Sequence, residues 1–407
     1  MNSGRYVLSQ VLEHIHWQTL KRLSARYGTE TRVRHFGCRQ QLICMVFAQL
    51  TWRAGLRDIV TCLNARSEAL YHLGFCEPVA RATLAEANEQ RDWRRWEDLA
   101  KGLMSQARTL YAGEDLGLDL ENTLYALDST TIDLSLTLFP WAGFRRTKAG
   151  VKIHTQLDLR GPIPTCIHVT NARQHDVLWL DELVLEPGAF YVMDRGYVDF
   201  QRLGLMAAAG AFFVTRAKDN LRFTRHRSLP TDSASGVRSD QIGKLTLATS
   251  RAAFPWPLRR VHYFDLETAR HLIFLTHHLA IPAVVVAGIY RLRWQIELFF
   301  RWIKGHLRIK HFFGNSPNAV KTQIWIAVST YLLVAILHKQ LRLPGTLHRT
   351  LQLLSVHPFE KIPLHELFTE TEFIAPPTGN PNQLLLWDLS ADARDKFNTS
   401  NQTYENQ

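Results

Sequence analysis

The segment Val151-Lys-Ile-His-Thr-Gln-Leu-Asp158 decides the fold class of this chain of 407 residues. Its apolar residues Val151, Ile153 and Leu157 alternate with polar ones, and this two-residue period is typical of a strand with one buried face. The residues that follow, Arg160-Gly161-Pro162, are typical of a turn. We therefore predict that a β-sheet with a hairpin lies in this part of the chain.

Further strands and helices are predicted on both sides of this segment. Residues 123–134 are rich in strand formers, and residues 165–170 return as a strand after the turn. A helix capped by Asp176 or a neighbour, a short strand, a helix and a strand are then expected at residues 176–185, 189–193, 200–209 and 211–215. The order β-β-β-α-β-α-β is typical of the ribonuclease-H-like fold, so we predict an α/β protein with a ribonuclease-H-like catalytic core.

The residues before this core predict only helices. Apolar side chains recur at helical spacing over residues 1–112, as in Leu42, Val46 and Leu50. The segment from Thr51 to Val60 has the pattern of a helix, a turn with glycine and a second helix. We expect an all-helical DNA-binding domain here, and a helical bundle with a solvated charged face is the alternative.

The second half of the chain divides into further regions. Residues 217–280 are polar and rich in turns, and they predict a β-rich insertion with strands at 260–264 and 271–275. Residues 281–307 predict one long helix, which returns the chain to the core. The expected layout is a catalytic core at 120–216 and 281–312, the insertion at 217–280, C-terminal helices at 313–372 and a polar tail at 373–407.

The charge of the chain points to a polyanionic partner. The formal net charge is +11 at pH 7, which favours nucleic acid or an anionic membrane surface. The longest apolar run, Ile324 to Leu337, is too short to span a bilayer and predicts a buried helix. The five cysteines form no CxxC pair, so neither a zinc site nor a disulfide framework is expected and a reducing cytoplasm is the default. Nucleic acid is therefore the favoured partner, and no membrane is expected.

The predicted long helix carries two separate stripes of side chains. At about 100° per residue, Tyr290, Arg293, Glu297 and Lys304 fall on one narrow polar face. The apolar stripe lies elsewhere on the helix and consists of Leu292, Ile296, Phe299, Ile303 and Leu307. An amphipathic helix needs only the apolar stripe, so the polar one suggests a site. The alternative is a solvated face with an Arg293–Glu297 ion pair.

Two aspartates occur where strands are predicted. Asp128 lies inside an apolar strand, and Asp194 lies where a buried strand meets a turn. Burial of a carboxylate is costly without a partner, and two Mg²⁺ ions shared by several carboxylates are one solution. Alternatives remain open at this point: Asp128 could cap a strand or pair with Arg145 or Arg146, and Asp194 could be a turn residue before Gly196.

The polar stripe resembles a known signature. Tyr290, Arg293, Glu297 and Lys304 match, at every spacing, the Y-(2)-R-(3)-E-(6)-K signature of the insertion-sequence-four family of DDE transposases. Asp128 and Asp194 lie in segments similar to those that carry the family's first and second acids. These two segments are Leu127-Asp-Ser-Thr130 and Met193-Asp-Arg-Gly196. Arg81-Ala-Thr-Leu-Ala-Glu-Ala-Asn88 with Arg91-Asp-Trp93 is similar to the family's N-terminal region. The resemblance extends to about residue 370.

The resemblance implies an activity and the residues that perform it. Asp128, Asp194 and Glu297 would be the catalytic residues and would bind two Mg²⁺ ions, with Mn²⁺ as a substitute. The enzyme would cleave DNA at the ends of its element and join them to target DNA, which is cut-and-paste transposition. The implied DNA-binding residues are Tyr290, Arg293, Lys304 and Arg195. The implied partner is double-stranded DNA, both terminal inverted repeats and target. A homodimer would form in the synaptic complex, in the cytoplasm at the bacterial nucleoid.

Other polar residues allow both a functional and a structural interpretation. Basic groups that could contact the DNA backbone, or simply be solvated, are Arg145, Arg146, Lys148, Lys152, Arg216, Lys218, Arg222, Arg225 and Arg227. His154, His168 and His175 with Asp176 are assigned a structural role, because three carboxylates suffice for the chemistry. Trp256 could stack on an extruded base, but a packed loop residue is the preferred interpretation.

Two other classes of function compete with a transposase. The chain could be a DNA-binding repressor or a domesticated relic without catalysis, which the three intact acids argue against. It could also be a ribonuclease-H-like nuclease that hydrolyses DNA without strand transfer. Short inverted repeats flanking the gene would favour a mobile element.

Overall fold

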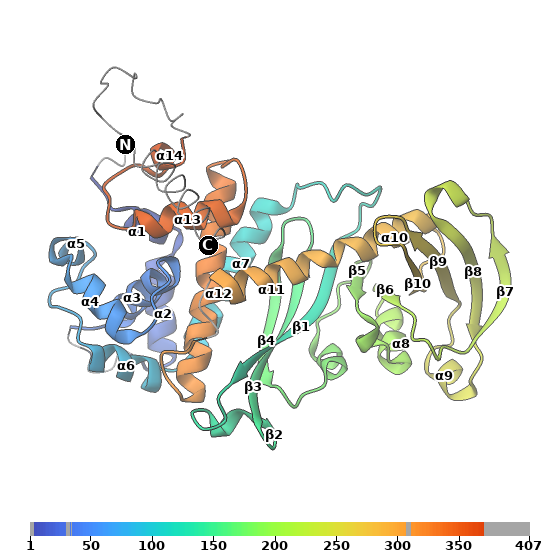
Figure 1. Cartoon of the computed structure of the whole chain (residues 1–407), viewed down its shortest axis with the longest axis horizontal. Coiled ribbons are helices and arrows are strands. Elements are labelled where there is room, and N and C mark those ends of the chain that lie inside the picture. Colours follow the sequence, from blue (N-terminus) through green and yellow to red (C-terminus); the bar gives the residue numbers. More distant parts are fainter. Residues whose placement is uncertain (1–3, 30–32, 34, 307–310, 370–407) are drawn as a thin grey trace, which may run out of the picture. The chain divides into compact units, whose positions relative to one another are not determined.

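A computed structural model describes residues 4–29, 33, 35–306 and 311–369 of the chain. Figure 1 shows a helical region, one large sheet, and a pair of consecutive helices that runs along the sheet. The part of the chain up to Leu367 forms one compact unit. The predicted polar tail at 373–407 lies outside the described residues.

The chain before the sheet is helical, as predicted. The helices are α1 (Val7–Val11), η1 (Leu12–His14), α2 (Trp17–Arg26), α3 (Cys38–Leu50), α4 (Leu56–Asn64), α5 (Ser67–His72), α6 (Arg81–Gln90) and α7 (Arg94–Tyr111). The segment from Thr51 to Val60 does contain a turn between two helices, because α3 ends at Leu50 and α4 follows Gly55. Almost every residue of α3 is buried, whereas α4 buries only Ile59 and Leu63. Only α4 of this pair therefore presents a polar face to solvent.

The C-terminal helices pack among these N-terminal ones. They are α12 (Pro317–Gln340), α13 (Leu347–Val356) and α14 (Leu364–Leu367). Helix α12 contacts α7, α3 and α6 (Figure 1). It is long and apolar enough to cross a membrane, but 94% of its apolar window is buried inside the protein. A helix that is apolar on all sides is stable at the centre of a soluble core, so the predicted buried helix is confirmed.

All strands join a single sheet. They are β1 (Leu124–Leu134), β2 (Gly143–Arg145), β3 (Lys148–Asp158), β4 (Ile163–Asn171), β5 (Phe190–Met193), β6 (Phe212–Arg216), β7 (Phe223–Leu229), β8 (Val237–Leu245), β9 (Leu258–Asp265) and β10 (Arg270–Thr276). Their order is β2-β3-β1-β5-β6-β10-β9-β8-β7, and β4 also pairs with β3. Strands β1, β3 and β4 are antiparallel, as the alternating sequence predicts. Strands β1, β5 and β6 are parallel. The chain returns from β1 to β5 through β3, β4 and a 3₁₀ helix, and from β5 to β6 through an α-helix.

The predicted insertion extends the sheet of the core. Its last strand, β10, pairs antiparallel with β6, so β7–β10 continue the same sheet. A buried ion pair of 2.6 Å joins Arg259 on β9 to Asp240 on β8. Arg259 also donates a hydrogen bond to the carbonyl of Ile281, just before the next helix. This arginine therefore ties the insertion to the chain that returns to the core.

Two predicted helices differ from the structure. Residues 176–185 form a short 3₁₀ helix, η3 (Asp176–Glu182), and the Asp176 side chain does not cap it. Asp176 instead accepts a hydrogen bond of 2.5 Å from Ser129 and pairs with Lys152 at 3.0 Å. These partners lie on strands β1 and β3, and such long-range contacts leave no local sequence pattern.

The predicted helix at 281–307 is interrupted. It consists of α10 (Ala283–Leu292) and α11 (Trp294–His306), separated at Arg293. The Arg293 N–H bonds to the Tyr290 carbonyl and the Ile296 N–H to the Arg293 carbonyl, which is the tighter three-residue pattern of a 3₁₀ turn. Of the predicted apolar stripe, Ile296, Phe299 and Ile303 are buried and Leu292 is partly buried, whereas Leu307 lies outside the described residues.

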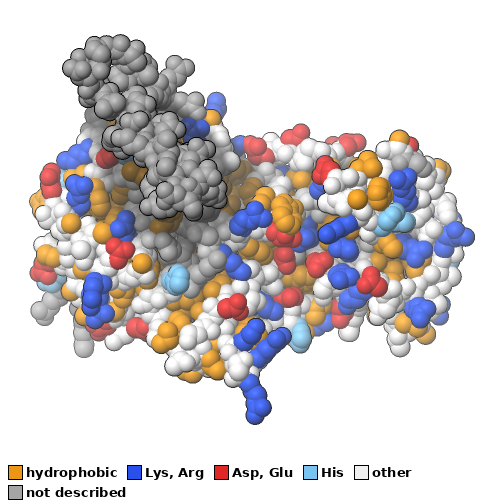
Figure 2. Space-filling model, viewed as in Figure 1, with side chains coloured by type: hydrophobic (Ala, Val, Ile, Leu, Met, Phe, Trp, Pro, Cys, Tyr) orange, Lys and Arg blue, Asp and Glu red, His pale blue; other side chains and the backbone are white. Residues whose placement is uncertain are grey.

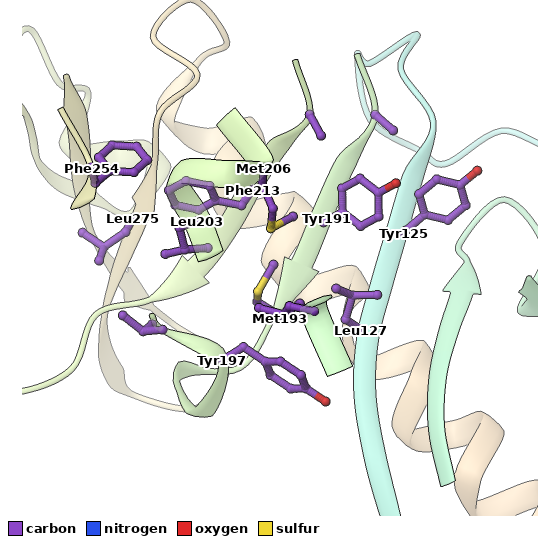
Figure 3. Close-up of a cluster of buried hydrophobic side chains, with 14 of the residues drawn as sticks. Tyr125, Leu127, Tyr191, Met193, Tyr197, Leu203, Met206, Phe213, Phe254 and Leu275 are labelled. Carbon is purple, nitrogen blue, oxygen red and sulfur yellow. The ribbon is translucent and has the colours of Figure 1, made fainter. Parts of the chain in front are cut away.

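Alternating residues of the central strands form a core on one face of the sheet. Figure 3 shows Tyr125, Leu127, Tyr191, Met193 and Phe213 projecting from β1, β5 and β6. Their cover includes helix α8 (Phe200–Ala208). Because side chains alternate along a strand, the residue after each of these faces the opposite side of the sheet. This alternation sets the direction of Asp128 and Asp194.

The buried pair gives a test of the insertion. Arg259→Ala leaves Asp240 buried without its partner, so the free energy of unfolding in urea should fall by about 3–5 kcal/mol. The double variant Arg259→Met/Asp240→Leu should recover most of that loss. Arg291→Ala breaks the exposed pair with Glu267 and serves as the control, with a change under about 1 kcal/mol. Equal losses for Arg259→Ala and Arg291→Ala would contradict this role.

Candidate active site

The two aspartates lie side by side because of strand register. Leu127 of β1 pairs with Met193 of β5 in the parallel ladder. Asp128 follows Leu127 on β1, and Asp194 directly follows the last residue of β5. Neighbouring strands are about 4.8 Å apart. Both side chains leave the sheet on the face opposite the core cluster of Figure 3. The ladder between the two strands ends here, which opens the sheet beside the carboxylates.

The polar stripe of the helix pair meets these aspartates. The Tyr290 hydroxyl donates to Asp194 Oδ1 at 3.5 Å. Arg293 donates from one terminal nitrogen to Asp128 Oδ2 at 3.4 Å and from the other to Glu297 Oε1 at 2.5 Å. A single guanidinium therefore spans two of the three predicted acids, and all three lie around the Tyr290–Glu297 turn.

Lys304 lies further along the same stripe. Its ammonium donates to the backbone carbonyl of Thr131 on β1 at 2.8 Å. Thr131 follows Asp128 by three residues, so Lys304 is held beside the strand that carries the first acid. The four residues of the helical stripe thus all face β1 or the end of β5, as a solvated helix face would not.

Burial and like charge act together on Asp128. Burial raises its pKa to about 6, while the Ser129 N–H and the Arg293 guanidinium lower it and the charges of Glu297 and Asp194 raise it again. Three negative groups therefore lie within electrostatic range of each other, and Arg293 pairs with two of them. A cation at this place would relieve the repulsion.

The carboxylates suit a hard divalent cation, although they are not assembled around one. Mg²⁺ is bound by carboxylate oxygens and keeps water and phosphate as further ligands. Within the described residues, no three Asp, Glu, His or Cys side chains are gathered closely enough to bind a metal ion as they stand. Arg293 lies between Asp128 and Glu297, where it supplies the positive charge. The donor set fits such an ion once Arg293 has released these oxygens.

Ser129 and Asp176 form a support that the sequence did not reveal. The Ser129 N–H donates to Asp128 Oδ1 at 2.8 Å, and its hydroxyl donates to Asp176. Lys152 neutralises Asp176 from the next strand. This chain of contacts orients the first acid from the core side of the sheet. No sequence signal marks it, because η3 has to pack on β1 before Asp176 reaches Ser129.

The other basic candidates have different surroundings. Asp128 pairs with Arg293, so its predicted alternative partners Arg145 and Arg146 are wrong; they are exposed on the β2–β3 hairpin. Figure 2 shows basic side chains protruding at the lower edge, where Figure 1 places this hairpin. Arg195 follows Asp194 and forms an exposed ion pair with Asp219 at 3.3 Å. Lys218 donates to the Val198 carbonyl.

The histidines and Trp256 fit structural surroundings. His154 is buried, contacts Thr170 at 3.1 Å and has its pKa lowered to about 4 by burial, so it is neutral at pH 7. His168 pairs with Glu182, and His175 is exposed. Trp256 lies against Phe254, with ring centroids 5.4 Å apart, and keeps part of its ring exposed.

Comparison with known proteins places this site in a family. A family model described as a transposase DDE domain matches residues 120–333, and one described as a domain of unknown function matches residues 3–76. A Sinorhizobium fredii protein whose name describes it as a transposase is 35% identical over 64% of this chain and 71% of its own length. A Geobacillus stearothermophilus protein, named for transposition of insertion sequence element IS5377, is 30% identical over 53% and 57%.

A third relative extends the match. A Synechocystis protein, named as a transposase for insertion sequence element IS4SA, is 25% identical over 70% of this chain and 77% of its own length. The region matched by the DDE model contains Asp128, Asp194 and Glu297 and more than half of the chain. The chain therefore belongs to the DDE transposase family of enzymes.

Proposed function

We propose that this enzyme is a cut-and-paste transposase that cleaves DNA at the ends of its insertion sequence and transfers them to target DNA. The observation that carries the proposal is the meeting of Asp128, Asp194 and Glu297. These residues are separated in sequence by 66 and 103 positions and lie on β1, directly after β5 and on α11. Family membership supplies the class of reaction, and the intact acids argue against a repressor without catalysis.

The strand order supports a ribonuclease-H-like core. Three consecutive antiparallel strands are followed by two parallel ones, in the spatial order β4-β3-β1-β5-β6. We assign residues 120–216 and 281–312 to this core and residues 217–280 to the insertion. We assign residues 1–112 to DNA binding, 313–372 to the C-terminal helices and 373–407 to a tail. Of the two helices α3 and α4, only α4 has an exposed face that could contact DNA.

Two Mg²⁺ ions, or Mn²⁺ in their place, would be held by Asp128, Asp194 and Glu297. Bound there, such ions activate a water molecule and stabilise the leaving oxygen of a phosphodiester. The Ser129 N–H donates a hydrogen bond to Asp128 and so holds its carboxylate in place. Arg293, once relieved of its two carboxylates, can turn to a phosphate of the DNA.

The remaining residues of the stripe would position the DNA. Tyr290 presents its hydroxyl beside Asp194, and Lys304 presents an ammonium two helical turns from Glu297. Arg195 is exposed next to the second acid. The substrates would be the terminal inverted repeats and the target duplex, bound by a homodimer in the synaptic complex at the nucleoid. Phosphate contacts of this kind set the position of DNA without reading its sequence.

The acids should be essential for cleavage but not for binding. Asp128→Ala, Asp194→Ala and Glu297→Ala should each abolish Mg²⁺-dependent cleavage of element-end DNA. Gel shifts should show binding preserved, because phosphate contacts supply most of the affinity. Glu267→Ala, in an exposed turn, is the matched loss of a carboxylate and should leave cleavage unchanged. Cleavage by Glu297→Ala at the wild-type rate would contradict the assignment of Glu297 as a catalytic residue.

The raised pKa of Asp128 predicts a pH dependence of stability in EDTA. The folded state binds this proton more tightly than the unfolded state, whose aspartate pKa is about 3.9. The free energy of unfolding should therefore fall as pH rises from about 4 to about 6. Asp128→Asn removes this effect, so it should be more stable than wild type by about 1–3 kcal/mol above pH 7 and nearly equal near pH 4. Urea unfolding at both pH values tests this, and a variant less stable above pH 7 would contradict it.

Lys304 should contribute to the cleavage rate, in addition to its hydrogen bond to the Thr131 carbonyl. Lys304→Ala should slow cleavage by about 10- to 100-fold, the cost of a lost charged hydrogen bond. Lys304→Arg should restore only part of the rate, since a planar guanidinium replaces a compact ammonium poorly. Lys101→Ala, which removes an exposed lysine on α7, is the control. Equal rates for the two alanine variants would leave Lys304 without a role in the reaction.

A further inference from the structure

One face of the insertion strands gathers cations. Leu258 and Leu275 belong to the core cluster on the face shown in Figure 3, and Arg260 pairs with Leu275 on the neighbouring strand. Because side chains alternate, His262 continues this row on β9. The cationic face, as we call it, consists of Arg225, Arg238, Arg260, His262 and His271.

These residues lie close together. Arg260 lies over the ring of Phe223 at 4.6 Å and donates to Gln241 at 2.6 Å. Arg238 lies over the ring of Phe264 at 5.3 Å. His262 and His271 are 3.0 Å apart between ring nitrogens. The side chains are thus held in place by aromatic rings and neutral partners rather than by acids.

The mutual proximity of the cations has an electrostatic signature. Burial lowers the pKa of Arg260, and the charge of Arg225 lowers it further. The pKa of His262 is lowered by burial and then by His271, Arg260 and Arg238. Like charges that depress each other's protonation in this way are unfavourable for the free protein and favourable for an anion bound among them.

The acids of the insertion are engaged elsewhere. Asp240 is buried with Arg259, Asp219 pairs with Arg195, and Glu267 pairs with Arg291. The other two, Asp232 and Asp265, accept hydrogen bonds within their own turns. Among the described residues, none of the three arginines of the cationic face is paired with a carboxylate. Arg202, by contrast, pairs with both Asp181 and Asp199.

The cationic face lies on the other side of the sheet from the candidate active site. Phe274 of β10 stacks on Tyr290 of α10, with ring centroids 4.8 Å apart. Phe274 and its neighbour Leu275 point to opposite faces, and Leu275 faces the core cluster. Arg260 shares the face of Leu275, whereas Asp128 and Asp194 share the face of Tyr290. A straight duplex at the carboxylates would therefore not continue onto the cationic face.

We propose that the cationic face binds the phosphate backbone of a second segment of duplex DNA, distinct from the segment held at the carboxylates. The inference rests on the proposed function in taking DNA as the polyanion. Arginines from three neighbouring strands with no acid among them complement a row of phosphates, and they would bind it without sequence preference. A second copy of the chain is a poorer occupant, because the net charge of +11 opposes association through a basic surface.

The test compares two double variants that remove equal charge. Arg225→Ala/Arg238→Ala alters the cationic face, whereas Lys244→Ala/Arg270→Ala removes two exposed cations from the opposite face of β8 and from the start of β10. All four side chains are exposed, so folding should be unaffected, and thermal unfolding checks this. Arg260→Gln is a third variant, which keeps a polar side chain beside Gln241.

Binding is measured in EDTA, so that cleavage is not needed for the readout. Two duplexes with different fluorophores are used, one with the element's end and one of unrelated sequence, and their presence in one complex is scored. Wild type should hold both. Arg225→Ala/Arg238→Ala should keep the end duplex but bind the unrelated one at least about tenfold more weakly, with a salt slope smaller by about 2. Arg260→Gln should act in the same direction.

Three outcomes would overturn the proposal. Equal loss of binding to the unrelated duplex in the two double variants would show that only the overall charge matters, and not the position of the cationic face. Loss of both duplexes together would place these arginines in the same DNA path as the carboxylates. Unchanged binding of the unrelated duplex would remove DNA as the occupant. Failure of the proposed transposition would instead appear as absence of end cleavage by wild type, which is a separate measurement.

Discussion

The in-register parallel pairing of β1 with β5 is the constraint on which the candidate site depends. It sets Leu127 beside Met193 in the core and therefore Asp128 beside Asp194 on the opposite face. A slip of β5 by one residue would turn Asp194 toward the apolar cluster and move Tyr191 and Met193 out of it. The core thus fixes the geometry of the acids, and the burial of Tyr125 and Tyr191 supports the position of Asp128 as much as any contact it makes.

Arg293 gives the site a second property. Its guanidinium holds Asp128 and Glu297 together and lies at the only break between α10 and α11 in the described chain. A short 3₁₀ turn in a helix is a place where small rotations cost little. The same residue neutralises two of the acids, while the buried residues Ile296 and Phe299 keep α11 on the sheet.

Local periodicity explains which parts of this protein could be predicted from sequence. Strand β3 alternates in sequence, β1 is rich in strand formers, β4 follows a turn, and the stripe from Tyr290 to Lys304 has a helical spacing. These elements were therefore predicted to within a few residues. The break between α10 and α11 at Arg293 was not predicted, because a single 3₁₀ turn hardly changes the spacing of apolar residues in a helix. The pairing of β10 with β6 and the Asp176–Ser129 contact join distant segments, and only tertiary packing determines them.

The position of α12 bears on how the chain is made. This helix is synthesised some 200 residues after α7, yet it fills the centre of the helical region between α7, α3 and α6. The N-terminal helices therefore leave the ribosome with their apolar faces uncovered and remain so until most of the chain has emerged. Any product that stops before Pro317 would keep those faces exposed to chaperones and proteases. A gene interrupted late would thus yield an unstable polypeptide rather than a stable fragment of the N-terminal helices.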